Sequence, residues 1–367
     1  LLTGRYHERF GFEINPADAS VAPPNYGIPR NVPTIAEQLK QAGYATAIYG
    51  KYALGFREDQ KPLARGFEEF FGFLEAGFDY LPEEIDRRAG RRKLLRGDTP
   101  IQETEYLTDA LARECVAFVD RHKDQPFFVY FSPNAVHGPL QADEERLRRF
   151  AHIAEKNRRI HAAMVVALDD AVGRILKSLR DNGLENNTLV VFTSDNGGPT
   201  ANTTSSNAPL RGVKGSLQEG GIRVPCLIQW PKHIPAGQVF EQPMISMDLT
   251  RTMLAAAGDN LEQSATDGIN LLPWLERKRT DYPERAHFWR VHNRPDQLFR
   301  WACREGKWKL LAEPHQSTPR LYDLEADIHE DHDLASANPD VVAHLTKIWT
   351  EWNKENPPYR PEDYRSR

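Results

Sequence analysis

Short, continuously apolar segments alternate with amphipathic segments through most of this chain, and this alternation constrains the fold more than any other feature. Apolar runs of strand length occupy residues 44–49, 126–131, 188–193 and 224–230. Apolar residues at helical spacing predict helices over residues 33–42, 107–122, 157–182 and 247–257. Strands without a polar face are typical of a sheet that helices cover on both sides. We therefore predict an α/β fold with a mostly parallel central sheet flanked by helices.

The pattern changes beyond about residue 280, where short strand-like runs are joined by tight turns such as Glu305-Gly306. Four strands are predicted over residues 287–291, 299–304, 307–312 and 320–324, and a helix follows over residues 339–352. These elements indicate a small antiparallel sheet that is closed by a helix. We expect a main α/β domain over residues 1–280 and a C-terminal subdomain over residues 281–367.

Composition excludes some classes of protein. The chain has 367 residues and a formal net charge of −5, which argues against a nucleic-acid-binding protein. It has no run of about 18 apolar residues, so no transmembrane helix is expected. Three scattered cysteines provide no disulfide framework, and we interpret them as small buried hydrophobic residues: Cys115, Cys226 and Cys303.

Three loops place polar side chains directly after predicted strands. Lys51 lies in the loop G-K-Y-A-L-G, and His137 lies in the loop S-P-N-A-V-H-G-P. Asp195 and Asn196 lie in the loop T-S-D-N-G-G. The carboxyl ends of parallel strands meet at one edge of a sheet, which is where α/β proteins bind their ligands. We therefore expect the three loops to converge on a single site.

Asp195 and Asn196 offer adjacent carboxylate and amide oxygens, which are ligands that calcium and magnesium prefer. The alternative is a simple Asx turn at the end of a strand. Two such residues are too few to hold a hard cation. Further carboxylates are therefore required, and none is obvious in this chain.

Three further residues are candidates for binding or protonating an anionic substrate. Lys51 sits in a glycine-flanked turn and could hold an anion as a point charge, although the alternative is a surface lysine. His137 could act as a general acid, or could be a loop histidine with a structural hydrogen bond. Lys214 lies between Gly212 and Gly215 in a flexible cationic segment, which suggests a site for a tetrahedral anion or an ordinary long loop.

Taken together, these segments resemble the type I sulfatase family of the alkaline-phosphatase-like superfamily. The matching motifs follow one another in order along nearly the whole chain: L-L-T-G-R at residues 1–5, G-K-Y-A-L-G, T-S-D-N-G-G, a G-x-K-x-x-x-x-E-G-G-x-R-x-P pattern ending at Pro225, and L-Y-D-L-E-A-D at residues 321–327. A single motif of this kind is weakly specific, whereas five in order are highly specific. The first residues lack an initiator methionine and resemble the helix after the family's nucleophile, so we expect the natural protein to begin upstream.

The resemblance implies a catalytic formylglycine, made from Cys or Ser, and a calcium ion. Two N-terminal acidic residues and an Asp-Asn pair hold this ion in the family. Carried over by motif, Asp195 and Asn196 would bind the metal, for which Mg²⁺ is an alternative. Lys51 and Lys214 would bind sulfate oxygens, and His137 would contact or protonate the leaving alcohol oxygen.

Two departures from the family pattern bear on activity. The C/S-x-P-S-R nucleophile signature and the acidic pair are absent from this sequence, and we expect them to precede Leu1. Ala53 stands where the family motif G-K-W-H-L-G has a histidine. A methyl group cannot exchange a proton, so the expulsion of sulfate from the nucleophile should be impaired. Engineered inactivation, a natural variant with another base, and a pseudo-enzyme are the three explanations that remain open.

The segment G-R-Y-H-E-R-F-G-F-E-I-N-P resembles bacterial sulfatases that act on polysaccharides. We therefore expect a sulfated carbohydrate substrate and a periplasmic or extracellular location. His292 and Arg294 are candidates to grip the sugar, or are inert surface residues. Two other functions remain open: a phosphodiesterase or phosphonate hydrolase of the same superfamily, and a catalytically inactive protein that binds sulfated glycans. The sequence does not define the sugar, the sulfate position or the oligomeric state.

Overall fold

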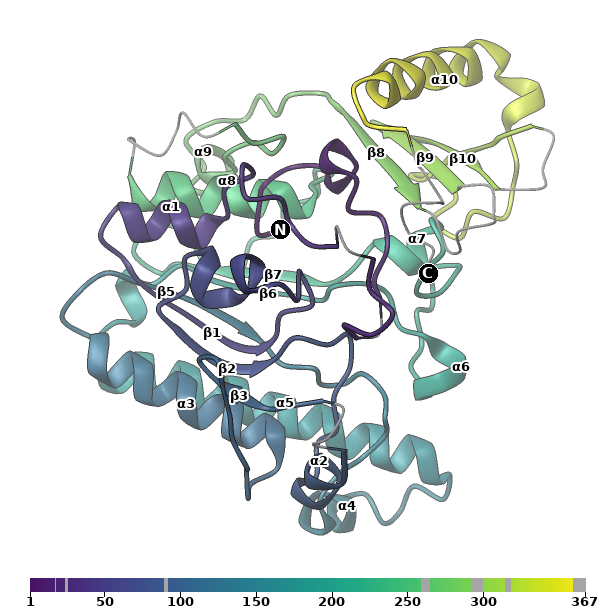
Figure 1. Ribbon diagram of the computed structural model, residues 1–367. Helices are drawn as coiled ribbons and strands as arrows, with labels where there is room; N and C mark the ends of the chain where they lie inside the picture. Colours follow the sequence, from purple (N-terminus) through teal and green to yellow (C-terminus); the bar gives the residue numbers. More distant parts are fainter. Residues whose placement is uncertain are drawn as a thin grey trace.

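The computed structural model describes residues 1–16, 18–23, 26–88, 92–258, 265–291, 300–313 and 318–358. Its central sheet has five strands in the order β4-β3-β2-β1-β5 (Figure 1). Three of them run parallel: β1 (Ala45–Lys51), β2 (Glu69–Phe73) and β5 (Phe127–Ser132). A short antiparallel hairpin completes one edge: β3 (Leu95–Arg96) and β4 (Thr99–Pro100). The predicted α/β fold is confirmed: the central sheet is mixed, with three parallel strands and an antiparallel hairpin at one edge.

Helices cover both faces of this sheet. Side chains on successive residues of a strand point to opposite sides, so an apolar strand places side chains that must be buried on both faces. Tyr49 of β1 belongs to a buried cluster with Phe118 of α3 (Leu107–His122), and α5 (Lys156–Asp181) packs against α3. The neighbouring Ile48 belongs to a second cluster on the opposite face. Leu39 and Leu254 join that cluster from α1 (Ile35–Gln41) and α8 (Ser246–Ala257).

The first helix, expected over residues 33–42, is observed over Ile35–Gln41 and begins at a capping box. The Thr34 hydroxyl accepts a 3.1 Å hydrogen bond from the backbone N–H of Glu37, and the Glu37 carboxylate accepts one of 2.8 Å from the N–H of Thr34. The two bonds satisfy N–H groups that the first helical turn leaves without partners. The remaining short α-helices of the described residues are α2 (Pro82–Arg88), α4 (Glu144–Arg149), α6 (Thr200–Thr203), α7 (Glu219–Ile222) and α9 (Leu272–Leu275).

The structure differs from the prediction at two of the apolar runs. Strands β6 (Val190–Thr193) and β7 (Cys226–Gln229) pair with each other in antiparallel fashion and form a separate two-stranded sheet. Their apolar composition suggested membership of the parallel sheet. An antiparallel pair needs no crossover helix between its strands, and the segment between β6 and β7 contains only the short helices α6 and α7.

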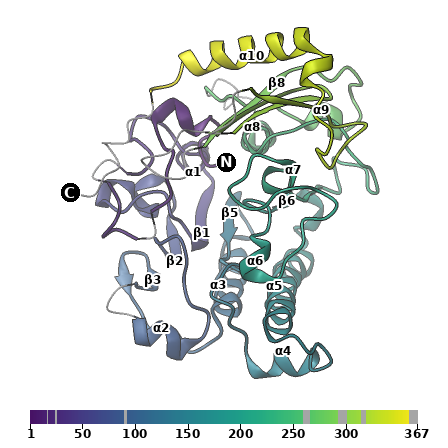
Figure 2. The ribbon, with the colours of Figure 1, turned by 90° about the vertical axis from the view of Figure 1, so that its right-hand side faces the viewer.

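The C-terminal elements form the predicted antiparallel sheet and helix. The strand order is β11-β10-β9-β8, with β8 (Ala286–Val291), β9 (Arg300–Glu305), β10 (Trp308–Ala312) and β11 (Arg320–Asp323). Helix α10 (Pro339–Lys354) packs Leu345, Trp349 and Trp352 on one face of this sheet. Figure 2 shows the opposite face turned toward α7 and the part of the molecule built on the central sheet.

The N-terminal segment packs on this C-terminal sheet. Tyr6 makes edge-on ring contacts with Phe288 and Trp352. Arg290 forms a buried ion pair with Glu13, with 3.0 Å between Arg290 Nε and Glu13 Oε2. Residues from both expected units thus share one packed interface, and the boundary near residue 280 stays a prediction. Within the described ranges, no helix has both the length and the apolar character needed to cross a bilayer.

Candidate active site

The ends of β1 and β5 open into the candidate site. Gly50 of β1 lies beside Ser132 of β5 in the parallel register. A Cβ atom on Gly50 would lie 2.1 Å from the Ser132 carbonyl oxygen, and the φ angle there is +124°, so only glycine fits this close approach. The next residue is Lys51, which is half-buried and ends the strand. The backbone therefore places the Lys51 side chain at the carboxyl edge of the sheet.

The loop after β5 holds His137. The hydroxyl of the buried Tyr80 lies 2.7 Å from the carbonyl oxygens of both Asn134 and His137, which anchors the loop. The His137 Nδ1 atom lies 2.7 Å from the Gly138 carbonyl oxygen. Only a protonated Nδ1 can donate to that oxygen, so Nε2 is the ring atom available to a substrate.

Asp195 and Asn196 follow β6 directly. The Asp195 side chain is exposed and makes no hydrogen bond or ion pair with the part of the chain that the structure describes. The Asn196 amide nitrogen donates a 2.9 Å hydrogen bond to the Gly197 carbonyl, a bond that does not use the amide oxygen. One carboxylate and one amide oxygen are thus available side by side.

Asn207, which sequence reasoning missed, joins this loop to the lysine loop. Its amide oxygen accepts a 2.8 Å hydrogen bond from the Gly198 N–H, and its amide nitrogen donates to the carbonyls of Gly198 and Gly212 at 2.9 and 3.0 Å. The Lys214 N–H in turn lies 3.4 Å from the Gly198 carbonyl oxygen. No local pattern marks Asn207, because all of its partners come from folding of the surrounding loops.

The charged groups of these loops lie close enough to perturb one another. Burial lowers the pKa of Lys51, the Asp195 carboxylate opposes this change, and the charge of Lys214 adds to it. Partial burial also lowers the pKa of His137, while the Gly138 carbonyl opposes the change and Lys214 and Lys51 add to it. Asp195 acts on His137 in the opposite direction to the lysines. The structure thus gathers one carboxylate, two ammonium groups and one imidazole, whereas their individual roles stay predictions.

Ala53 lies in the loop that follows Lys51. It is buried, and its φ angle of +48° is in the left-handed region that a residue with a Cβ atom rarely adopts. Its carbonyl oxygen accepts a 2.6 Å hydrogen bond from the Tyr26 hydroxyl, which holds the backbone there. The methyl group brings no proton donor or acceptor to this position.

The loop that follows the third parallel strand, β2, passes close to His137, which the sequence did not indicate. Glu75 follows β2, and burial raises the pKa of its carboxyl while the charge of Arg92 opposes the change. The Arg92 guanidinium donates a 3.0 Å hydrogen bond to the Gly77 carbonyl. A Cβ atom on Gly77 would lie 3.7 Å from the His137 ring.

The donor chemistry fits part of a site for a hard cation. Asp195 and Asn196 provide oxygen ligands of the kind that calcium takes. Among the described residues, no group of three or more His, Cys, Asp and Glu side chains could hold a metal ion. A cation bound at Asp195 and Asn196 would therefore need further ligands. The substrate candidates His292 and Arg294 lie outside the described residues.

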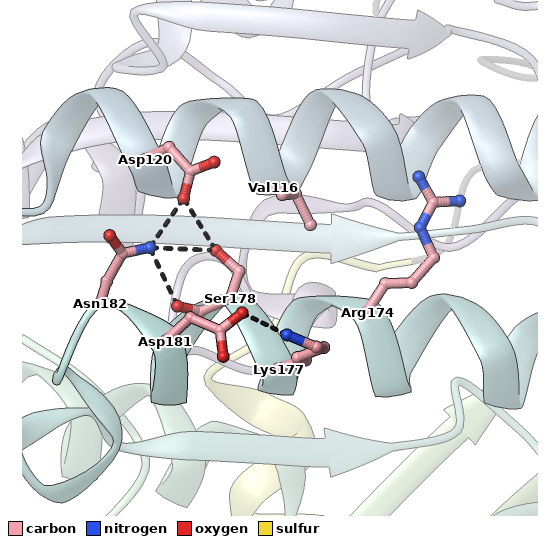
Figure 3. Close-up of a pocket in the computed structure, with 7 residues that line it drawn as sticks. All are labelled: Val116, Asp120, Arg174, Lys177, Ser178, Asp181 and Asn182. Atoms are coloured by element: carbon pink, nitrogen blue, oxygen red, sulfur yellow. Dashed lines mark hydrogen bonds and ion pairs between the residues drawn. The ribbon is translucent and has the colours of Figure 1, made fainter.

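A surface hollow lies away from these loops, between α3 and α5 (Figure 3). It has a volume of about 230 Å³ and includes Asp120, Ser178 and Asn182 in its lining. The Asp120 carboxylate accepts hydrogen bonds of 3.1 Å from Ser178 and 2.7 Å from Asn182. These polar groups satisfy one another, so we do not assign the hollow to the site.

Comparison with known proteins bears on what this arrangement does. A family model described as Sulfatase matches residues 1–259, and one described as N-sulphoglucosamine sulphohydrolase, C-terminal, matches residues 214–355. N-acetylgalactosamine-6-sulfatase of Sus scrofa is 33% identical over 394 residues, which cover 95% of this chain and 74% of that protein. The Homo sapiens protein of the same name is 32% identical, with coverage of 95% and 73%.

Solved structures show the same relationship. The crystal structure of Ps i-CgsB in complex with k-i-k-neocarrahexaose has a TM-score of 0.89 and 34% sequence identity to this chain. The match covers 98% of this chain and 81% of that chain.

Proposed function

The chain belongs to the sulfatase family and is a sulfuric ester hydrolase, and on this basis we propose that it removes sulfate from a carbohydrate. The observation that carries the proposal is the closeness of Lys51 and His137, at the carboxyl ends of β1 and β5, to Asp195 and Lys214, which come from loops next to the separate β6-β7 pair. A sulfate ester is a tetrahedral anion that needs cations around its oxygens and a proton donor near its leaving group. These four side chains provide that combination.

Lys51 and Lys214 bind the sulfate oxygens in this proposal. Ammonium groups held in place before the reaction stabilise charge on the transferring group without reorganisation. Burial and the neighbouring charge of Lys214 lower the pKa of Lys51. This is expected where two ammonium groups are held close together without an anion between them. Sulfate between them would relieve their mutual repulsion.

His137 contacts or protonates the leaving oxygen in this proposal. Its Nδ1–H is engaged with the Gly138 carbonyl, which fixes the orientation of the ring and turns Nε2 to the substrate. A proton delivered from Nε2 to the departing alkoxide would complete the alcohol product. The alternative function for the same atom is a hydrogen bond to that oxygen without full proton transfer.

We further propose that Asp195 and Asn196 hold Ca²⁺, with Mg²⁺ as the alternative ion. The missing ligands and the nucleophile, a formylglycine made from Cys or Ser, would come from residues that this sequence does not contain. When bound, the cation would neutralise negative charge on the sulfate group. The hydrogen bonds of Asn207, which join the Asp195 loop to the Lys214 loop, would keep the two proposed ligands and Lys214 in fixed positions around such an ion.

The carbohydrate substrate is supported by the relatives. N-acetylgalactosamine-6-sulfatase is named for a sugar sulfate, and Ps i-CgsB was crystallised with k-i-k-neocarrahexaose. Both are similar to this chain at more than 30% identity over nearly its whole length. Action on polysaccharide fragments would suit a periplasmic or extracellular enzyme, and we propose that location.

The test is release of sulfate by the complete protein, with k-i-k-neocarrahexaose and N-acetylgalactosamine 6-sulfate as carbohydrate probes. An aryl sulfate and an aryl phosphodiester serve as matched chromogenic probes. We expect sulfate release from a carbohydrate and preference for the aryl sulfate over the phosphodiester. Preference for the phosphodiester would instead indicate a phosphodiesterase. Binding of a sulfated glycan without turnover, even after Ala53→His, would indicate a catalytically inactive binding protein.

A further inference from the structure

A lysine is fully buried in the C-terminal sheet. Lys309 of β10 is 0% exposed, and its Nζ atom lies 2.8 Å from Glu219 Oε1 and 2.9 Å from Glu330 Oε1. The two carboxylate side chains are 3% and 0% exposed. Removing three charges from water is costly, so such a triad contributes little net stability but strongly restricts geometry.

Glu219 connects this triad to the candidate site. It begins α7, in the same glycine-rich segment as Lys214 and five positions further along the chain. Its backbone N–H donates a 2.7 Å hydrogen bond to Glu330 Oε2, so Glu330 holds both the backbone and, through Lys309, the side chain of Glu219. Two more cations face Glu219 Oε2, with Arg223 at 3.7 Å and Arg304 at 3.9 Å.

Other contacts from the C-terminal region hold the segment on both sides of Lys214. The Arg300 guanidinium of β9 donates a 2.9 Å hydrogen bond to the Gly215 carbonyl, next to Lys214. The Arg211 guanidinium donates a 3.1 Å hydrogen bond to the Glu330 carbonyl. Leu217 is buried in a cluster with side chains of the small sheet. Figures 1 and 2 both place α7 beside this sheet, on the face opposite α10.

The segment around Lys214 needs such support because its own sequence provides little. Gly212 and Gly215 flank the lysine with φ angles of +93° and +86°, and Gly220 and Gly221 follow Glu219. Glycines leave the backbone free to adopt many conformations. The triad gives this flexible segment a charged anchor in the C-terminal sheet.

We propose that Lys309 and Glu330 are positioning residues that act through Glu219 to place Lys214 against the sulfate group. The small C-terminal sheet would then help to position a residue that binds the anion. This inference rests on the proposed role of Lys214 in binding sulfate. The binding of sulfate by Lys214 would then depend on Lys309 and Glu330, although neither of them contacts the sulfate group.

The experiment compares Lys309→Met and Glu330→Gln with the matched control Lys307→Met in the complete protein. Lys307 lies two positions away, and its partly exposed side chain pairs with Asp323 at 2.6 Å. Hydrogen exchange of peptides covering residues 210–223 reports on the segment itself. Competitive inhibition by inorganic sulfate, together with kcat and KM, reports on the site. Thermal unfolding checks that each variant is folded.

We expect faster exchange of the 210–223 segment and on the order of tenfold weaker inhibition by sulfate in both triad variants. Lys307→Met should behave like the parent. In a Lys214→Met background, Lys309→Met should cause no further loss of sulfate affinity, because its effect passes through Lys214. A purely structural role would lower the unfolding temperature without this dependence on Lys214.

Parent-like exchange and sulfate inhibition in a folded Lys309→Met or Glu330→Gln protein would overturn the inference. The isosteric Glu330→Gln decides the matter if Lys309→Met does not fold, because it keeps the shape of the triad. A parent protein that neither binds nor releases sulfate would instead contradict the proposed function. Hydrogen exchange distinguishes failure of this inference from failure of the proposed function, because it measures the mobility of residues 210–223 without any substrate.

Discussion

The Ser132 hydroxyl donates a 2.8 Å hydrogen bond to the Lys51 carbonyl oxygen, and this bond joins β5 to β1 at the point where both strands open into the site. The position of Lys51 is thus fixed by a hydrogen bond from the neighbouring strand β5 as well as by its own strand β1. The same edge receives His137 from the loop after β5. The lysine and the histidine are therefore placed by one shared piece of backbone.

Ser132→Ala should weaken this junction. The Lys51 carbonyl would lose its hydroxyl partner, which predicts a loss of about 1 kcal/mol in the free energy of unfolding. A few-fold fall in kcat/KM should accompany it, since Lys51 would be held less firmly. Chemical denaturation and steady-state kinetics measure the two effects. Ser336→Ala, at an exposed position in the C-terminal region, is the control and should leave both unchanged.

Ala53→His should restore an imidazole beside Lys51 and raise turnover on a sulfate ester by about a hundredfold or more, the usual contribution of a positioned acid or base. The backbone favours this change, because histidine tolerates the left-handed conformation at position 53 better than most residues. Sulfate release by the complete protein measures the effect.

Ala53→Gly is the matched control for that substitution. Glycine relieves the positive φ angle of +48° and should stabilise the fold by about 1 kcal/mol without adding a proton donor. Turnover should stay at the parent level in this variant. If histidine and glycine give equal turnover, position 53 has no role in proton transfer.

The activity should depend on pH through His137. Burial and the charges of Lys214 and Lys51 hold the pKa of His137 below its ordinary value of 6.5. If the protonated ring donates to the leaving oxygen, kcat should fall as pH rises through this lowered pKa. Removing a positive charge with Lys214→Met should raise the pKa of His137 and move the decline in kcat to higher pH. NMR titration of the imidazole and pH profiles of kcat measure both shifts.

Lys177→Met is the control for that titration, because Lys177 pairs with Asp181 on α5 and does not contribute to the pKa of His137. It should leave the profile unchanged. A decline that does not move in Lys214→Met would show that the two side chains are not electrostatically coupled, and a move to lower pH would contradict the expected direction of the coupling.

Calcium should stabilise the complete protein if Asp195 is a ligand. A cation present at 100 times its dissociation constant stabilises the folded state by about 2.7 kcal/mol, which is seen as a higher unfolding temperature. Asp195→Asn removes one negative ligand and should abolish most of this increase, and chelation should lower the activity of the parent. Asp181→Asn, on α5, should respond to calcium as the parent does. An equal response in both variants would exclude Asp195 as a ligand.

Much of this arrangement could be read from periodicity. The helix expected over residues 157–182 is observed as Lys156–Asp181, and the strand expected over residues 126–131 is observed as Phe127–Ser132. Such elements follow from the local spacing of apolar side chains, which any stable packing must bury. Because Lys51 ends one such strand and His137 lies in the loop after another, their placement at one edge was also predictable.

What the sequence determined by itself was therefore the type and order of the elements and the residues that stand at their ends. Only the tertiary structure decided which elements pair, as in the antiparallel pairing of β6 with β7, and which distant side chains meet. Lys309 and Glu219 are 90 positions apart, and nothing near either one indicates the other. The local spacing of apolar residues determines which face of an element is buried. The partner of a buried charge, in contrast, depends on which distant residues the complete fold places next to it.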